Sequence, residues 1–168
     1  MTDENVITDM EAPIYLNYNF TAGGAATRFL TEIKEGRLVA QRCPSNGLVY
    51  MPPRGSCPIS GEATTEEVQL GNKATVESFT IVHIPIPGNA LQPPIVIANL
   101  VPDGVNHSFI HLMSECDNDS VHIGQRVEAV WKPKEEWDIS MNNIAYWRPL
   151  EEPDVPIEKI GKLDVNGE

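Results

Sequence analysis

The sequence predicts a mainly β protein in which a short N-terminal helix precedes a small ribbon and a closed barrel or sandwich. The barrel or sandwich is indicated by four segments rich in β-branched residues, VESFTIVHIPI, PPIVIANLV, HSFIHLM and RVEAVWKP. They follow one another after Val68 at a spacing of roughly ten residues, which is typical of all-β domains. Turn signals with glycine or proline separate them, and no helical pattern lies between them.

Length, composition and charge limit what the chain does. A chain of 168 residues builds one ordinary core with a small appendage, but not two full-sized domains. No apolar run approaches the roughly 20 residues that cross a bilayer, and no basic-then-apolar leader opens the sequence, so we expect a cytoplasmic protein outside the membrane. The net charge of −12 repels phosphate backbones and anionic lipids, so nucleic acid is not an expected partner.

Residues 1–37 are expected to form an arm and one helix. The first twenty residues are acidic, then mixed and aromatic, and taken together they show no clean period, which indicates an arm lying on another surface. The pattern becomes helical from Ala25, because Phe29 and Ile33 share a face and Gly36 is placed to end the helix. A helix of this length cannot bury its apolar stripe alone, so it needs a neighbour.

The segment from 38 to 66 is predicted to be a small ribbon, because two apolar pieces each stand beside a turn with the frame C-P-x-x-G. The frame positions are Cys43 and Asn46 in the first turn and Cys57 and Ser60 in the second. A zinc ribbon places two thiolates three residues apart on such turns, whereas a neutral amide or hydroxyl is a poor zinc ligand. We therefore predict a ribbon without metal; a zinc site completed by Cys116 or a histidine, and coincidence, are the alternatives.

The C-terminal boundaries follow from the strand pattern and the prolines. Residues 67–148 are assigned to the barrel. Residues 149–168 are assigned to an extended acidic tail, because three prolines precede a polar end that a partner would have to hold.

No catalytic set is predicted. The histidines at 83, 107, 111 and 122 fall in or beside predicted strands, and no G-x-S-x-G, H-E-x-x-H or Walker-type loop accompanies them. His107 and His111 share one strand face by the period of two, but ordinary barrel-wall residues are the favoured interpretation over a metal pair. Cys116 lies in an acidic turn, where carboxylates raise the pKa of a thiol and weaken it as a nucleophile.

Two groups of residues are candidates for contact with a partner or ligand. Arg54 stands on a proline-stiffened turn, where a guanidinium can grip a phosphate or carboxylate; a surface arginine packed on the ribbon is the equal alternative. Aromatic residues gather near the chain ends, where they either wrap another subunit or pack over the barrel ends. The set is Tyr15, Tyr18, Phe20, Trp131, Trp137, Tyr146 and Trp147.

The motifs RCPSNG, PPRGSCPISG and HIGQRVEAVWKP, with the tail LEEPD, resemble in this order the acyl-CoA-associated zinc-ribbon/OB-fold family, known as domain of unknown function thirty-five. The run from FIHLMSECDNDS through NNIAYWRP is most similar to stand-alone bacterial members encoded beside lipid-transfer-type thiolases and steroid side-chain aldolases. The likeness covers roughly residues 20–156 and implies a rubredoxin-like ribbon followed by an OB-fold barrel. Typical members carry three or four ribbon cysteines, so Asn46 and Ser60 depart from the pattern, and zinc is not expected.

The resemblance implies a non-catalytic accessory subunit of a thiolase-superfamily enzyme, either a thiolase or a retro-aldolase, that acts on acyl-CoA substrates in steroid or lipid degradation. It implies a hetero-oligomer with two copies of each chain. Acyl-CoA would belong to the complex, Arg54 would meet a CoA phosphate or the partner, and this chain alone would bind no cofactor. The alternatives are an OB-fold module for nucleic acid or another ligand, and a small free-standing acyl-CoA enzyme acting through Cys116 or a histidine.

Overall fold

The computed structural model describes residues 9–85, 88 and 91–161. An extended arm leads into helix α1 (Gly23–Lys34), which begins two residues before the predicted start. The helix ends where the sequence placed its stop: Gly36 has a φ of +74° and donates its N–H to Ile33 O, while Arg37 donates to Glu32 O. Glycine suits this left-handed position because it has no Cβ to clash. None of the helices in the described part is long and apolar enough to cross a bilayer.

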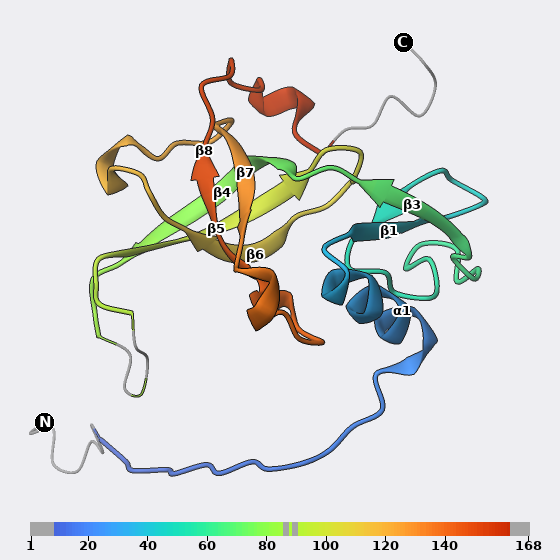
Figure 1. The fold of residues 1–168 in the computed structure, drawn as a ribbon, viewed down its shortest axis with the longest axis horizontal. Helices are drawn as coiled ribbons and strands as arrows, with labels where there is room; N and C mark the ends of the chain where they lie inside the picture. The colour runs from blue at the N-terminus through green and yellow to red at the C-terminus, as the bar shows by residue number, and fades with distance from the viewer. Residues whose placement is uncertain (1–8, 86–87, 89–90, 162–168) are drawn as a thin grey trace, which may run out of the picture.

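The ribbon is a three-stranded antiparallel sheet made of β1 (Leu38–Arg42), β2 (Val49–Tyr50) and β3 (Glu66–Leu70). Strand β1 lies in the centre, and α1 packs beside the sheet (Figure 1). Strand β3 was not predicted, because three of the five residues of its EEVQL sequence are polar and exposed. It pairs along its backbone with β1, and Glu66 also pairs with Arg42 of β1.

The second unit is a closed five-stranded barrel. Its strands are β4 (Lys73–Val82), β5 (Ile95–Pro102), β6 (Phe109–Met113), β7 (Arg126–Trp131) and β8 (Ile144–Pro149). They close in the order β4-β5-β6-β8-β7, with antiparallel pairs except the parallel contact of β6 with β8. This is the strand order of an OB fold, so the predicted fold class is confirmed.

Short 3-10 turns complete the chain: η1 (Asn118–Ser120), η2 (Lys134–Glu136), η3 (Met141–Asn143) and η4 (Ile157–Lys159). The segment from 150 to 161 runs along the outside of the barrel rather than leaving it (Figure 1). The polar end of the predicted tail, residues 162–168, lies outside the described residues.

One continuous core joins the helix, the ribbon and the barrel. Phe29 and Ile33 of α1 belong to the same buried cluster as Leu38 of β1 and Val76 and Trp147 of the barrel. The helix therefore finds the neighbour that its apolar stripe required.

Polar contacts close the seam between ribbon and barrel. The buried Asn143 donates to Ile33 O at 3.2 Å, and Asn106 exchanges two hydrogen bonds with the backbone of Val49. The indole of Trp137 lies over Gly36, where an added Cβ would approach it to 2.5 Å. Ribbon and barrel are thus packed as one body.

Candidate functional site

The structure brings together the four frame positions of the two C-P-x-x-G turns, Cys43, Asn46, Cys57 and Ser60, which we call the knuckle. Asn46 Nδ2 donates to Cys57 Sγ at 3.4 Å, and Ser60 Oγ lies 3.7 Å from Cys43 Sγ. Ser45 also contacts both Cys43 Sγ, at 3.2 Å, and Ser60 Oγ, at 3.1 Å. The doubled C-P-x-x-G frame thus folds as two facing turns, and each turn is closed by a backbone hydrogen bond from its glycine to its cysteine carbonyl.

The donor set does not fit a structural zinc ion. Two buried thiols, an amide and a hydroxyl face one another, and they satisfy each other by hydrogen bonding rather than offering four anionic or imidazole donors. Across the described ranges, no three His, Cys, Asp or Glu side chains are grouped to hold a metal ion. The predicted ribbon without metal is therefore consistent with the chemistry of its donors, and its metal content stays a prediction.

The packing of the knuckle shifts the pKa values of Cys57 and Tyr50. Burial opposes the charged form of Cys57, but hydrogen bonds from the Ser60 side chain and backbone, from Cys43 and from Ile59 outweigh it and lower the pKa to about 5. Burial, with the neighbouring Cys57, raises the pKa of Tyr50 to about 12. A thiolate that is 1% exposed cannot be reached by a substrate, so this cluster is structural.

Arg54 lies at the edge of the ribbon. Its guanidinium carbon is 5.6 Å from the centre of the Tyr50 ring, and the ring of His107 stacks beside the same tyrosine at 5.4 Å. The residue remains exposed, and no carboxylate in the described part of the chain pairs with it. Arg54 therefore packs on the ribbon, as one interpretation predicted, while its outer donors stay free for an anion.

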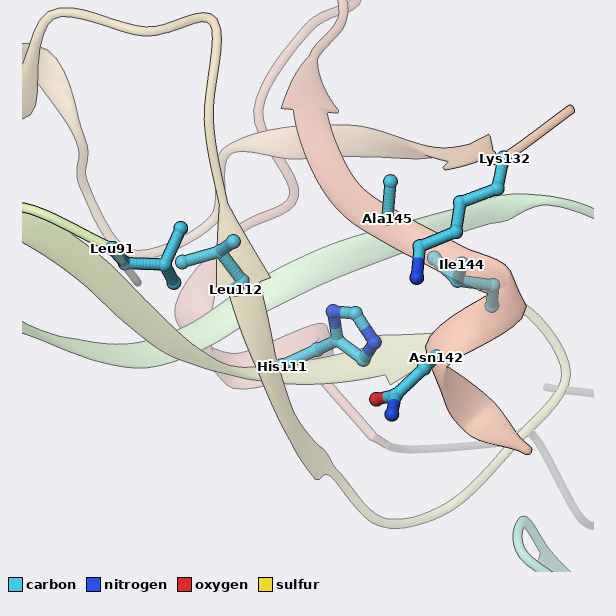
Figure 2. Close-up of a pocket in the computed structure, with 7 residues that line it drawn as sticks. All are labelled: Leu91, His111, Leu112, Lys132, Asn142, Ile144 and Ala145. Atoms are coloured by element: carbon cyan, nitrogen blue, oxygen red, sulfur yellow. The ribbon is translucent and has the colours of Figure 1, made fainter. Parts of the chain in front are cut away.

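The histidines do not form a metal pair. His107 lies against the ribbon, whereas His111 lines a pocket of about 370 Å³ on the barrel wall with Lys132 and Asn142 (Figure 2). Burial lowers the pKa of both imidazoles. The pocket, which was not predicted from the sequence, has no acid, thiol or hydroxyl among its lining residues; its ionisable groups are the imidazole of His111 and the amine of Lys132.

The remaining predicted groups are dispersed. Burial and then Asp117 raise the pKa of Cys116; the direction is the one predicted from the sequence, but burial rather than a carboxylate is the larger cause. Trp137 is half-buried at the seam, where its Nε1 donates to Lys132 O and its ring lies 5.5 Å from Trp131. Tyr146 is half-buried too and donates to a carboxylate oxygen of Glu115.

The aromatic residues of the two chain ends differ sharply. Tyr15, Tyr18 and Phe20 stand on the arm and are 94, 71 and 78% exposed. Trp147 is completely buried, because its position in β8 points the indole into the barrel against Phe109. The prediction of a partner-facing residue is wrong for Trp147, and the competing interpretation, packing in the barrel, holds there.

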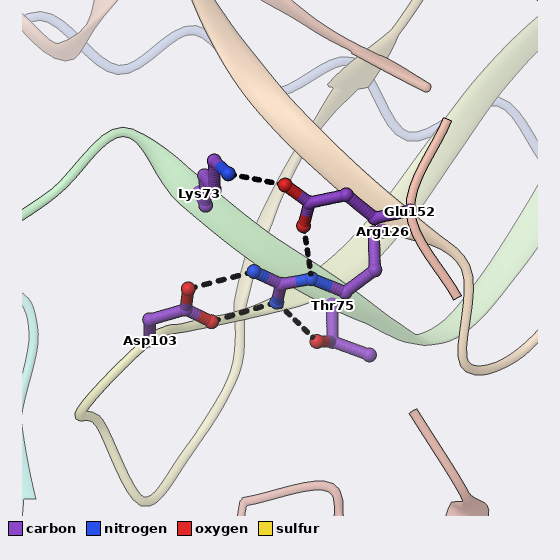
Figure 3. Close-up of polar contacts among 5 residues, drawn as sticks. All are labelled: Lys73, Thr75, Asp103, Arg126 and Glu152. Carbon is purple, nitrogen blue, oxygen red and sulfur yellow. Dashed lines mark hydrogen bonds and ion pairs between the residues drawn. The ribbon is translucent and has the colours of Figure 1, made fainter. Parts of the chain in front are cut away.

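A cationic clamp that the sequence analysis missed holds the C-terminal segment on the barrel. Arg126 donates to both oxygens of Asp103 at 2.7 Å, to Thr75 Oγ1 at 2.8 Å and to Glu152 at 3.3 Å (Figure 3). Lys73 pairs with the other oxygen of Glu152, and this contact, more than that with Arg126, lowers the pKa of that carboxyl.

A second contact holds the same segment further along. His122 Nε2 lies 2.9 Å from Asp154 Oδ2, and Nδ1 faces Ser120 O at 2.8 Å. The Ser120 carbonyl and then Asp154 raise the pKa of His122. Two of the three carboxylates of the LEEPD motif are thus held by basic residues: Glu152 by Lys73 and Arg126, and Asp154 by His122.

Comparison with known proteins matches both units. The family described as the ChsH2 rubredoxin-like zinc ribbon domain matches residues 31–66, and the ChsH2 C-terminal OB-fold domain matches residues 67–132. A DUF35 domain-containing scaffold protein of Methanocaldococcus jannaschii is 32% identical over 65% of this chain and 78% of its own length. A scaffold protein of the same name from Pyrococcus furiosus is 30% identical over 61% of this chain and 74% of its own.

Solved structures share the fold. The Ltp2-ChsH2(DUF35) aldolase contains a chain that superposes with a TM-score of 0.57 at 24% identity, over 73% of this chain and 91% of that one. A DUF35-family protein of unknown function from Sulfolobus solfataricus gives the same TM-score at 19% identity, over 76% and 84%. Because a zinc-ribbon model and an OB-fold model match in this order, and a DUF35 protein is 32% identical over 78% of its own length, the chain belongs to the DUF35 family.

Proposed function

We propose that this chain is a non-catalytic accessory subunit that binds a thiolase-superfamily enzyme acting on acyl-CoA substrates. The observation that carries the proposal is the match, over 65% and 61% of this chain, to relatives named scaffold proteins. The fold is also that of a chain in the Ltp2-ChsH2(DUF35) aldolase, which supports an enzyme subunit as the partner.

The geometry supports the same role. In the described part of the chain two thiols are buried, the third, Cys116, has a raised pKa, and no three His, Cys, Asp or Glu side chains are grouped to hold a metal ion. By contrast, the arm holds several large apolar side chains in water, as a segment does when its contact surface belongs to another subunit. An acidic chain of this kind is suited to a protein partner rather than to nucleic acid.

The finer features of the proposal follow from the resemblance. The partner would be a thiolase or retro-aldolase of steroid or lipid degradation, assembled as two copies of each chain. Acyl-CoA would bind at the complex, where Arg54, an exposed guanidinium without a carboxylate partner in the described structure, would meet a CoA phosphate.

Co-expression with candidate thiolase-superfamily proteins of the source organism tests the proposal. We expect one complex on size exclusion with light scattering, and an enzyme that is more stable or more active than the same enzyme alone. Arg54→Gln should raise the KM for acyl-CoA several-fold at unchanged complex mass, whereas Arg148→Gln, an exposed arginine already paired with Glu128, should not.

Two results would overturn the proposal. The first is a monodisperse monomer that shows no affinity for that enzyme. The second is turnover of an acyl-CoA thioester by this chain alone that is abolished by Cys116→Ala, because the chain would then be a free-standing enzyme.

A further inference from the structure

Apolar and mostly polar residues alternate along the extended arm, residues 10–20. The even-numbered positions are apolar: Met10, Ala12, Ile14, Leu16, Tyr18 and Phe20. The odd-numbered positions are polar apart from Pro13 and Tyr15. Successive side chains of a β-strand point to opposite faces, so in a strand conformation these eleven residues present one apolar face roughly 35 Å long.

Nothing in the described structure covers this face. The large even-numbered side chains are 71–80% exposed, and the arm runs clear of the ribbon and barrel (Figure 1). The backbone of residues 9–21 makes no hydrogen bond to the rest of the described chain. The arm therefore presents both an uncovered apolar stripe and an unpaired row of N–H and C=O groups, as an isolated edge strand does.

We propose that residues 10–20 add as a β-strand to an open sheet edge of the partner enzyme subunit, with the even-numbered side chains lying on an apolar surface beside that edge. Strand addition pairs the backbone N–H and C=O groups through main-chain hydrogen bonds and places alternate side chains in pockets. It would therefore bury the apolar face and satisfy the unpaired backbone groups together. The inference rests on the proposed function, because it states how that partner is held.

A helix in a groove does not fit the arm. Its apolar residues recur every two positions rather than every three or four, and Pro13 would interrupt a helix. In a strand, proline is tolerated where the N–H would face solvent. Because Pro13 is odd-numbered, the odd residues turn their backbone groups to solvent and the even residues turn theirs to the partner.

A second copy of this chain is a poor recipient. The barrel is closed and offers no edge, and the free edges of the ribbon are the two-residue β2 and the strand β3. Strand β3 exposes Glu66, Glu67 and Gln69 rather than an apolar surface. An arm of a second copy that paired with β3 would place Asp9 and Glu11 close to these glutamates. Two chains of charge −12 also repel each other, so the edge belongs to a different, less acidic protein.

Double variants of the even-numbered and of the odd-numbered side chains test the inference, in the full-length chain co-expressed with the thiolase-superfamily protein that binds it. The even-face variant Leu16→Ser with Tyr18→Ser should weaken the complex at least about 100-fold, because each buried apolar side chain contributes about 10-fold or more. The matched odd-face variant Asn17→Ser with Asn19→Ser should stay within about twofold. Neither should change the melting temperature of the free chain, since the arm lies outside the core.

Substitution of Tyr15 distinguishes strand addition from nonspecific hydrophobic association. It is the most exposed aromatic residue of the arm but lies on the odd face, so Tyr15→Ser should weaken the complex less than about threefold. Equal losses from Tyr15→Ser and Tyr18→Ser would overturn the inference.

Amide hydrogen exchange in the complex shows directly which backbone N–H groups of the arm are hydrogen-bonded. The amides of Ile14, Leu16 and Tyr18 should be protected, while those of Asn17 and Asn19 exchange freely. Uniform protection, no protection, or wild-type self-association that the even-face variant abolishes would each overturn strand addition to the partner.

The two proposals fail in different ways. If the wild-type chain does not bind the enzyme subunit, the proposed function fails and takes this inference with it. If a chain lacking residues 1–20 binds as tightly as the wild type, the accessory role stands and only the strand addition is refuted.

Discussion

Replacing Arg126 by methionine should release the C-terminal segment from the barrel. The side chain of Arg126 is 10% exposed and donates to Asp103, Thr75 and Glu152 at the start of β7 (Figure 3). Methionine keeps a straight apolar stem of similar length, so the loss is confined to the contacts of the guanidinium.

The magnitude follows from the exposure of the partners. A charge-assisted bidentate pair contributes about 1.5–3 kcal/mol, but Asp103 is 51% exposed and Glu152 34%, so both regain water and the loss falls toward the lower end. The hydroxyl of Thr75 is buried and loses its partner, which costs about 1 kcal/mol. We therefore expect a loss of about 2–3 kcal/mol, or a fall in Tm of about 4–12 °C for a chain of this size.

Thermal unfolding by calorimetry at 0.15 M salt measures this loss, and limited trypsin digestion near Lys159 measures release of the tail. The matched control is Arg148→Met, because Arg148 also pairs with two carboxylates, Glu115 and Glu128, but is 46% exposed. That control should cost less than about 1 kcal/mol. A fall in Tm below 2 °C for Arg126→Met, with unchanged digestion, would refute the reasoning.

Three further predictions test the knuckle, the helix end and the tail. Asn46→Cys combined with Ser60→Cys should complete a four-thiolate site and bind about one equivalent of zinc by elemental analysis, whereas an equivalent in the unaltered chain would contradict the metal-free ribbon. Gly36→Ala should lower the free energy of unfolding in urea by more than about 1 kcal/mol, because a φ of +74° and an indole 2.5 Å from the new Cβ both oppose it; an unchanged midpoint would be inconsistent. NMR titration should place the pKa of His122 above 6.5 and Asp154→Asn should lower it, so the tail contact is complete below pH 6.5 and is lost as pH rises through the raised pKa; tail protection that grows with pH would exclude this.

Patterns within a few residues predicted much of the fold. Strands β4 to β7 were visible because β-branched runs alternate with turn residues, and the end of α1 was visible because Gly36 follows a stripe with helical spacing. Strand β3 was not predicted, since exposed polar residues occupy three of its five positions, and the alternation of the arm gained meaning only once its backbone was known to be extended.

The two C-P-x-x-G turns were predictable from the sequence, whereas the contacts between distant strands were not. The amino-acid sequence alone determined that Cys43 and Cys57 stand on matching turns with an amide and a hydroxyl in place of two thiols, because short-range turn geometry sets these positions. Only the tertiary structure decided that Trp147 is buried, that Arg126 joins Thr75 and Glu152, and that the arm is left uncovered. Those outcomes depend on how strands far apart in the chain close a barrel, and the energy of such long-range pairing is not encoded in any local pattern.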